Sequence, residues 1–436
     1  MTKAMKDSGI EWIGEIPEDW SISRIKNVAS LYTGNSIKDE HKDMYTDKIE
    51  AKPYIATKDI EAGSCVINYD NGLYVKHDDE SFKIATKGSS LMCIEGGSAG
   101  RKKAFLEEDV AFVNKLCCLS PFNVNEKFLF QFICSKNFED EFTRHISGLI
   151  GGVSVSALKN FNIALPSMPE QQKIADFLDE KCGHIDSVLE KTKASIEEYK
   201  QLKQSVITQA VTKGIRPNRP MKDSGIEWIG EIPEDWEICK LKYLTSLVTD
   251  GSHIAPDTSE LKRKFVSVAD MNEYGDIDFD SCLKITEEQY QYLKRTGCKP
   301  KCNDILISKD GTIGKTTIVK TQESFVVASS LVIIRPKNNL NSEYLRYILM
   351  SENTQRQLNL LVAGTALKRV SVNKNANLLI VNTLNMNEQQ EIVTYLDDRC
   401  SEIDKLIAKK EQLIEELEIY KKSLIYEYVT GKKEVC

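Results

Sequence analysis

Two long segments of the chain, residues 166–216 and 383–436, carry a hydrophobic pattern that predicts amphipathic helices. Apolar residues recur in steps of mostly three, four or seven, which places one apolar stripe along an otherwise charged helix. In the first segment the predicted stripe comprises Leu178, Ile185, Leu189, Ile196, Tyr199, Val206 and Ala210. In the second segment it comprises Ile392, Leu396, Ile403, Leu406, Leu413, Leu417, Tyr420 and Leu424.

Each predicted long helix begins at a local sequence signal. Ser167 with Glu170, and Asn385 with Glu388, match a capping box, in which two side chains satisfy backbone N–H groups of the first turn. A helix of about forty residues is roughly 65 Å long, and its single apolar stripe needs a covering partner. We therefore expect the two segments to pair as an antiparallel coiled coil. The alternative is two separate amphipathic helices, each packed on its own domain.

Between the long helices the pattern changes to short runs that are rich in β-branched and aromatic residues, and this predicts strands. The predicted strands are 53–56, 89–94, 110–113, 304–308, 316–319 and 331–335, and short helices are expected at 127–135 and 342–351. Strands mixed with helices predict an α/β (mixed α+β) fold, with one compact domain before each long helix.

The two halves of the chain are copies of one another. Residues 5–20 read MKDSGIEWIGEIPEDW, and the identical string recurs at 221–236. Weaker similarity continues through the domains, where the loop 95–101 aligns with 309–315, and into the long helices. This tandem duplication predicts a first α/β domain, a central long helix, a second α/β domain and a C-terminal long helix, at 1–165, 166–216, 217–382 and 383–436.

The formal net charge of −7 would argue against a nucleic-acid partner if it were evenly spread. Each copy of the repeated string, however, has one Lys against five Asp and Glu, which is −4. The two strings together therefore hold −8, and the rest of the chain is close to neutral, at +1. The remaining surface is free to carry local basic patches.

Composition excludes several classes of protein. The chain of 436 residues has no apolar run long enough for a membrane helix, and its first residues lack the apolar core of a signal peptide. Its 12 cysteines are scattered without a Cys-x-x-Cys pair, and its 5 histidines do not cluster. This usage favours reduced thiols in a cytoplasm and argues against a metal site.

One segment of the second half, Lys309 to Thr317, resembles a phosphate-binding loop because it contains Gly-x-x-Gly-Lys-Thr. Lys309, however, occupies the position of the first glycine that this motif requires. The Thr-Thr-Ile-Val that follows Lys315 favours a strand, whereas a phosphate-binding loop opens a helix. We favour a turn between two strands, and nucleotide binding through 311–316 is the alternative.

The motifs of serine hydrolases, zinc proteases and dinucleotide-binding enzymes are missing from the sequence. We therefore expect this chain to contain no catalytic residues, no metal and no cofactor.

All four tryptophans, Trp12, Trp20, Trp228 and Trp236, lie in the repeated string. Such large rings bury much apolar area and act as rigid anchors. We expect the string to clamp each domain onto the long helices, and the alternative is that it forms part of a partner surface.

The diverged loops hold polar residues that suit contacts with phosphates or bases. In the first domain they are Asn35, Ser36, Lys38, Lys58, Gly97, Ser98, Arg101, Lys102 and Lys103. In the second domain they are Ser252, His253, Lys309, Thr312, Lys315, Lys368 and Arg369. Each of them can equally be an ordinary polar loop residue.

Several motifs together resemble the specificity subunits of type I restriction–modification systems. They are Gly-Ile-Glu-Trp-Ile-Gly-Glu-Ile-Pro-Glu-Asp-Trp at the opening of each half, Asp-Ile-Leu-Ile-Ser at 304–308, and Glu-Gln-Gln at 170–172 and 388–390. The resemblance covers essentially the whole chain. It implies two target-recognition domains, each reading one half of a bipartite, asymmetric site in double-stranded DNA. It also implies that the long helices act as a spacer and as a docking surface.

The partners that the resemblance implies are two methyltransferase subunits and motor–nuclease subunits. S-adenosylmethionine, and ATP with magnesium, would then be bound by those partners, and the chain itself would be a non-catalytic cytoplasmic protein of host defence. Two further alternatives are a structural coiled-coil adaptor and a specificity subunit whose partner fuses methylation with cleavage.

Overall fold

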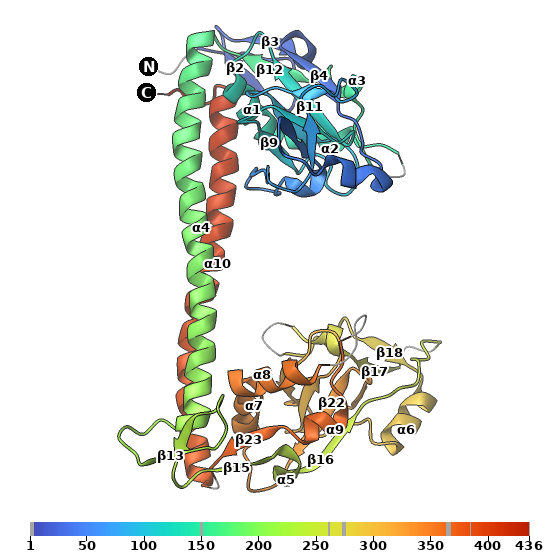
Figure 1. The fold of residues 1–436 in the computed structure, drawn as a ribbon, viewed down its shortest axis with the longest axis vertical. Coiled ribbons are helices and arrows are strands. Elements are labelled where there is room, and N and C mark those ends of the chain that lie inside the picture. Colours follow the sequence, from blue (N-terminus) through green and yellow to red (C-terminus); the bar gives the residue numbers. More distant parts are fainter. Residues whose placement is uncertain are drawn as a thin grey trace. The chain divides into compact units, whose positions relative to one another are not determined.

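A computed structural model describes residues 4–148, 151–259, 262–272, 276–362, 368–383 and 385–435 (Figure 1). The chain divides into two compact units, one formed by Met1–Lys193 with Glu411–Cys436 and the other by Ala194–Lys410. Each unit contains one α/β domain and one end of each long helix. These helices, α4 (Met168–Lys213) and α10 (Met386–Val429), therefore contribute to both units.

The first domain is built on two small sheets. One has the strand order β4 (Ala29–Thr33), β11 (Leu116–Pro121), β8 (Ser90–Cys93), β9 (Lys103–Phe105), and the other β6 (Tyr74–Lys76), β5 (Ala51–Ile55), β10 (Val110–Phe112), β7 (Ile84–Ala85). Strand β1 (Met5–Asp7) pairs with β2 (Glu15–Pro17), and β3 (Ser21–Arg24) pairs with β12 (Asn162–Leu165). The helices are α1 (Glu126–Cys134), α2 (Lys136–Arg144) and α3 (Val155–Leu158). All named strand pairs are antiparallel except β5 with β10.

The second domain repeats this arrangement. Its sheets have the orders β16 (Thr245–Asp250), β22 (Leu331–Pro336), β19 (Ile305–Ser308), β20 (Thr316–Ile318) and β18 (Leu283–Ile285), β17 (Arg263–Val266), β21 (Phe325–Val327). Strand β13 (Met221–Asp223) pairs with β14 (Glu231–Pro233), and β15 (Glu237–Lys240) pairs with β23 (Leu379–Asn382). The helices are α5 (Leu241–Leu244), α6 (Glu287–Arg295), α7 (Ser342–Met350), α8 (Glu352–Leu361) and α9 (Val372–Ala376).

The predicted fold class is confirmed, and every predicted strand and short helix overlaps an observed element. The strands correspond to β5, β8, β10, β19, β20 and β22, and the short helices to α1 and α7. The pattern missed the pairing of β3 with β12 and of β15 with β23, because each joins segments that lie far apart in sequence.

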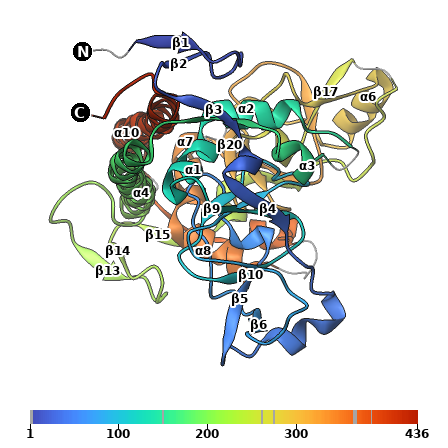
Figure 2. The same ribbon diagram turned by 90° about the horizontal axis from the view of Figure 1, so that it is seen from above.

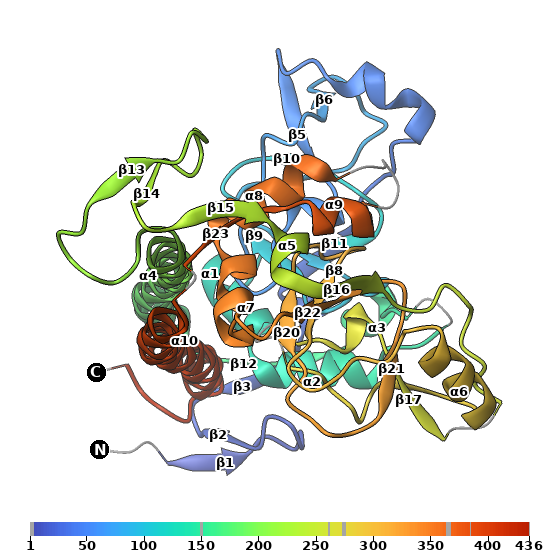
Figure 3. The same ribbon diagram turned by 90° about the horizontal axis from the view of Figure 1, so that it is seen from below.

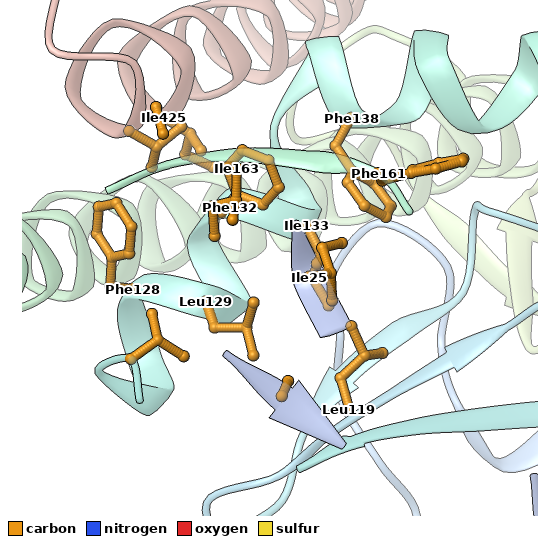
Figure 4. Close-up of a cluster of buried hydrophobic side chains, with 14 of the residues drawn as sticks. Ile25, Leu119, Phe128, Leu129, Phe132, Ile133, Phe138, Phe161, Ile163 and Ile425 are labelled. Atoms are coloured by element: carbon orange, nitrogen blue, oxygen red, sulfur yellow. The ribbon is translucent and has the colours of Figure 1, made fainter. Parts of the chain in front are cut away.

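A continuous apolar core joins each domain to the long helices. In the first unit, Phe128 and Phe132 of α1, together with Phe138 of α2, are buried in a cluster that also contains Ile425 of α10 (Figure 4). In the second unit, Tyr344 and Ile348 of α7 are buried in a cluster that includes residues of both α4 and α10. Burial of such large side chains ties each domain firmly to the helix ends within its own unit.

The predicted stripe of α4 is confirmed. Leu178, Ile185, Leu189 and Ile196 are buried, and Cys182 and Thr192 fill the intervening seam positions. The steps alternate between four and three residues, so the apolar seam keeps facing α10 in each unit. The pairing is antiparallel, since in the first unit Phe177 stacks on Tyr428 at 4.5 Å while Asp186 binds Lys421. The helices lie side by side in both end-on views (Figures 2 and 3).

The predicted stripe of α10 is wrong at three positions after Ile403, which are Leu406, Leu413 and Tyr420. Leu406 and Leu413 are 42% and 41% exposed, and Tyr420 is also exposed. The buried positions are Leu396, Cys400, Ile403 and Ile407, and half-buried Ile414 and Leu417 lead on to buried Leu424. The prediction skipped Cys400 and then stepped by three to Leu406, and it placed Leu406, Leu413 and Tyr420 on the face beside the seam, whereas its Leu417 and Leu424 do lie in the seam. Lys410 and Lys421 are half-buried and lie in the observed seam, whereas the prediction had placed the nearby Leu413 and Tyr420 there.

Two lysines in the seam pair with acids of the opposite helix at equivalent places. In the second unit, Nζ of Lys203 donates to both carboxylate oxygens of Asp404 at 2.7 Å. In the first unit, Nζ of Lys421 donates to both oxygens of Asp186, at 2.6 and 2.7 Å. Burial alone would lower the pKa of Lys421, but the hydrogen bond and the charge of Asp186 raise it above its usual value. These pairs favour the antiparallel register, because a shift would leave a half-buried charge without its partner.

The repeated tryptophan strings clamp the ends of the long helices, as expected. Trp20 and Trp236 are fully buried. The acidic residues that lie in sequence between each hairpin and its tryptophan are exposed to solvent. Gly214 follows α4 and packs against Trp236, and Gly431 follows α10 and packs against Pro17 and Trp20. Both glycines have positive φ, 74° and 71°, so each helix ends in a left-handed turn beside a tryptophan ring. In Figure 3 the hairpin β13–β14 lies beside the end of α4.

The capping box predicted for α10 forms only in part. The side-chain oxygen of Asn385 accepts the N–H of Glu388 at 3.3 Å. The carboxylate of Glu388 turns inward, where it binds Arg219 at 2.6 Å, Thr383 at 2.7 Å and the indole N–H of Trp236 at 3.1 Å. A buried carboxylate gains more from a cation and two neutral donors than from one backbone N–H, which is why the reciprocal half of the box is replaced.

The Glu-Gln-Gln motifs hold a short helix of each domain on a long helix. The side-chain oxygen of Gln171 accepts the backbone N–H of Asn125, the N-cap residue of α1, at 2.8 Å. Gln389 makes the same bond, also at 2.8 Å, with Asn341, the N-cap residue of α7. The motif is therefore part of the duplicated framework and is distant in sequence from the diverged loops.

Candidate nucleic-acid interface

The diverged loops of the two domains grow from the same set of backbone hydrogen bonds. In the first domain the N–H of Cys93 donates to Lys102, and the N–H of Val153 donates to Ile94 at 2.9 Å. In the second domain the N–H of Ser308 donates to Lys315, and the N–H of Val370 donates to Lys309 at 3.0 Å. We call this shared arrangement of sheets and loop anchors the common frame.

The common frame corrects the loop alignment that the sequence predicts. It matches Ile94 with Lys309 and Glu95 with Asp310, one residue away from the alignment of 95–101 with 309–315, and it also matches Gly152 with Arg369. The reason is a difference in turn length: nine residues, 94–102, connect β8 to β9 where seven residues, 309–315, connect β19 to β20. The neighbouring strands place Thr33 opposite Cys117 and Asp250 opposite Val332, so these two residues are also equivalent.

The nucleotide-binding alternative is not supported. Lys315 is followed by strand β20, and the backbone around Gly311 and Gly314 forms the turn between β19 and β20. A phosphate-binding loop needs the N-terminus of a helix at this point. The amine of Lys315 is also engaged, because it donates to the backbone carbonyl of Met271.

Lys102 and Lys103, like Lys315, point into their own domains. Lys102 donates to the carbonyl of Thr57 at 2.8 Å, in a position equivalent to that of Lys315. Lys103 is only 5% exposed and lies over the ring of Phe138, 5.6 Å from its centroid. We therefore withdraw Lys103 as a phosphate contact, since strand β9 directs its side chain into the interior. Successive side chains of an extended segment point to opposite faces, so Lys102 and Lys103 cannot both point to the same side. The sequence pattern could have indicated this.

The remaining candidates of the first domain are mainly exposed and neutral or basic. Asn35 accepts the N–H of Lys83 at 3.0 Å and so supports the loop, while Ser36 donates to Asn114 at 2.7 Å on the surface. Lys38 and Lys58 are exposed at the starts of short 3-10 turns. In the 95–101 loop, Arg101 is exposed and donates to the carbonyl of Gly97, next to Ser98.

The second domain instead brings together five ionisable residues, Asp250, His253, Lys309, Asp310 and Arg369, which we call the ionic cluster. Asp250 accepts from Lys309 at 2.6 Å and lies 2.7 Å from the ring of His253. The side chain of Lys309 is only 4% exposed. Asp310 accepts two hydrogen bonds from Arg369, at 2.7 and 3.1 Å.

Asp250 is held as an anion in this cluster. Burial alone would raise the pKa of its carboxyl group, but the hydrogen bonds from Lys309 and His253 lower it below the usual value. Asp250 thereby fixes the buried amine of Lys309 and orients the exposed imidazole of His253 at the surface.

The other candidates of the second domain divide between turn and surface. Ser252 is buried, and its hydroxyl donates to the carbonyl of Ile254, so it shapes the turn. Thr312 is exposed at the tip of the 310–314 turn, and Lys368 is exposed beside Arg369.

The sequence-based candidates omitted Asp250 and Asp310. Both are acids, and the search for phosphate contacts favoured bases. The signal that could have identified Asp310 was its place beside the candidate Lys309, just after the predicted strand 304–308, and Asp250 lies two residues before the candidate Ser252.

Within the described ranges, no group of three or more His, Cys, Asp or Glu side chains can hold a metal ion. Among the helices of those ranges, none is long and apolar enough to cross a membrane.

Comparison with known proteins identifies the duplicated domain. A family model described as "Type I restriction modification DNA specificity domain" matches residues 17–198 and again 233–418. The two matches together cover most of the chain, and they coincide with the two copies seen in sequence and structure.

Relatives with this domain extend over nearly the whole chain. The MjaVIII specificity subunit of Methanocaldococcus jannaschii, described as belonging to a type I restriction enzyme, is 25% identical over 96% of this chain and 94% of its own length. The EcoBI specificity subunit of Escherichia coli is 23% identical over 93% of this chain and 84% of its own. A solved chain described under "complex assembly" of "the type I R-M system" has a TM-score of 0.70 at 14% identity, covering 96% of this chain and 99% of that one, and shows the same fold.

Proposed function

The chain belongs to the family of type I restriction–modification DNA specificity proteins, and from this membership we propose how its two domains work. It is the DNA-binding specificity subunit of a type I restriction–modification complex. Each domain reads one half of a bipartite, asymmetric site in double-stranded DNA.

The observation that carries this proposal is one common frame with different loop chemistry. Thr33, Ile94 and Gly152 of the first domain occupy the places of Asp250, Lys309 and Arg369 in the second. Identical backbone anchoring with unlike side chains is what two readers of unlike half-sites require, because base edges are distinguished by donor and acceptor groups.

On this proposal the long helices bind the partner subunits, and the two domains bind the DNA. The helix pair sets the distance between the half-sites and offers its outer faces to two methyltransferase subunits, which motor–nuclease subunits join. Those partners bind S-adenosylmethionine, and ATP with magnesium, and this chain supplies no catalytic residue. Its work takes place in the cytoplasm, where the DNA and the partner subunits meet.

The proposal is tested by exchanging one domain. Residues 30–150 are replaced with the corresponding residues of another family member, and the chimaera is expressed with its methyltransferase partner. Sequencing of methylated genomic sites should show one half-site changed and the other retained. If both half-sites changed, or if neither did, the assignment of one half-site to each domain would be wrong.

The same preparation separates the alternatives. A structural adaptor predicts no sequence preference even when the partner is present. A partner that fuses methylation with cleavage predicts both activities from a complex of only two kinds of chain. The purified specificity chain alone should neither methylate nor cut DNA.

A further inference from the structure

Arg369 is held in place through both its backbone and its side chain. Its backbone forms an antiparallel bridge with Asp310, and the next residue, Val370, is buried and donates its N–H to Lys309 at 3.0 Å. Its Nε donates to one oxygen of Asp310 at 2.7 Å, and its Nη2 donates to the other at 3.1 Å. The guanidinium group is therefore fixed before any ligand arrives.

This pairing leaves one edge of the guanidinium group unused by Asp310. A guanidinium group has five N–H donors, and two of them serve the carboxylate, on the edge formed by Nε and Nη2. The opposite edge, formed by Nη1 and Nη2, keeps two roughly parallel N–H groups. The Arg369 side chain is 52% exposed, so a ligand can approach it. Two parallel donors on one edge match the O6 and N7 acceptors of a guanine in the major groove.

The neighbouring charges do not compete for that edge. Asp250 already accepts from buried Lys309 at 2.6 Å and lies against His253, so its charge is compensated within the ionic cluster. Arg335 forms a similar two-bond pair with Asp304, but it is 26% exposed and lies near the end of β22, in the part of the domain that both copies share. Arg369 lies where the copies differ, since Gly152 takes its place in the first domain.

We propose that Arg369 reads a guanine in the half-site bound by the second domain, and that Asp310 is the positioning residue that aims it. This inference rests on the proposed function of the chain as a DNA-specificity subunit. The first domain has no side chain at the equivalent position, so its half-site is read without this contact.

The test uses the full chain in complex with its methyltransferase partner. Arg369→Ala and Asp310→Asn are compared with the unchanged chain by sequencing methylated sites and by measuring methylation of duplexes that differ at single positions. In the Arg369→Ala complex, one guanine position of one half-site should lose its preference by roughly tenfold or more, while the other half-site stays intact. Asp310→Asn should relax the same position by a smaller factor, because the donor edge remains but is no longer held.

Two controls keep the outcome interpretable. Arg263→Ala removes another partly exposed, ion-paired arginine of the same domain, bound to Glu287 at 2.5 Å, and should leave the methylated sequence unchanged. The double variant Arg369→Ala/Asp310→Ala is used if the single variant folds poorly, because removing both partners leaves no unpaired carboxylate. It should relax the same guanine position.

The results that overturn the inference are distinct. Uniform weakening at all sites, with a reduced salt dependence and an unchanged motif, would make Arg369 a phosphate contact. Full retention of the guanine preference in Arg369→Ala would exclude any base contact. If the unchanged complex methylated no defined sequence, the proposed function itself would fail, whatever the variants did.

Discussion

The two domains of this chain differ most at three positions where their backbones are most alike. Thr33, Ile94 and Gly152 are neutral in the first domain, and Asp250, Lys309 and Arg369 occupy the equivalent places in the second. Backbone hydrogen bonds hold these positions in both copies, so the same backbone arrangement accepts unlike side chains. Recognition chemistry can therefore change while the frame stays the same.

The largest effects should come from disrupting the apolar seam between α4 and α10, which is present in both units. Leu189 and Ile407 occupy equivalent buried positions in the seam. Leu189→Asp and Ile407→Asp should each lower the free energy of unfolding by about 3 kcal/mol or more, because each leaves an uncompensated charge in an apolar contact. Thermal unfolding of the full chain measures both losses.

Leu413→Asp is the matched control for the corrected register. Leu413 is an exposed residue of α10, so its replacement should cost less than about 1 kcal/mol. A loss of unfolding free energy as large as that of Ile407→Asp would contradict the corrected register and support the stripe that the sequence pattern predicted.

The next largest effect should come from making the second domain resemble the first. Lys309→Ile alone leaves the carboxylate of Asp250 without its buried cation and should cost about 2–3 kcal/mol of stability. Adding Asp250→Thr should recover most of this loss, because it removes the carboxylate that lost its cation and restores the neutral pair found in the first domain. Melting temperatures of the single and double variants give the comparison, and a double variant no better than the single one would contradict it.

A smaller difference is expected between the two buried tryptophans. Trp236 donates its indole N–H to Glu388 at 3.1 Å, whereas the indole N–H of Trp20 finds no acceptor among the described residues. Trp236→Phe should therefore cost about 1–2 kcal/mol more than Trp20→Phe, since only the first removes a hydrogen bond to a buried carboxylate. Equal losses would show that the hydrogen bond contributes nothing beyond packing.

The smallest effect should come from exposed lysines of the first domain. Lys38→Ala is expected to leave stability and the methylated sequence unchanged and to reduce the dependence of DNA affinity on salt by about one charge. Binding of the partner-containing complex at several salt concentrations measures this slope. A changed motif would instead assign Lys38 to a base contact.

Much of the architecture was determined by local sequence pattern. The duplication was visible in the repeated string, and the strands around 304–308 and 331–335 were visible in their β-branched runs. The stripe of α4 was predictable because its seam residues follow regular steps with few apolar residues elsewhere. In α10 the apolar residues Leu406, Leu413 and Tyr420 lie beside the seam, so periodicity alone selected the wrong neighbour.

Tertiary structure decided which loop residues act together. The sequence offered Lys309, His253 and Arg369 as separate polar residues, but it did not specify that they pair with Asp250 and Asp310. These partners are 59 residues apart in the Lys309–Asp250 and Arg369–Asp310 pairs. Local pattern determines helices and strands because their hydrogen bonds are short in sequence. An ion pair across two loops depends on how the sheet brings distant strand ends together, and only the folded chain specifies that.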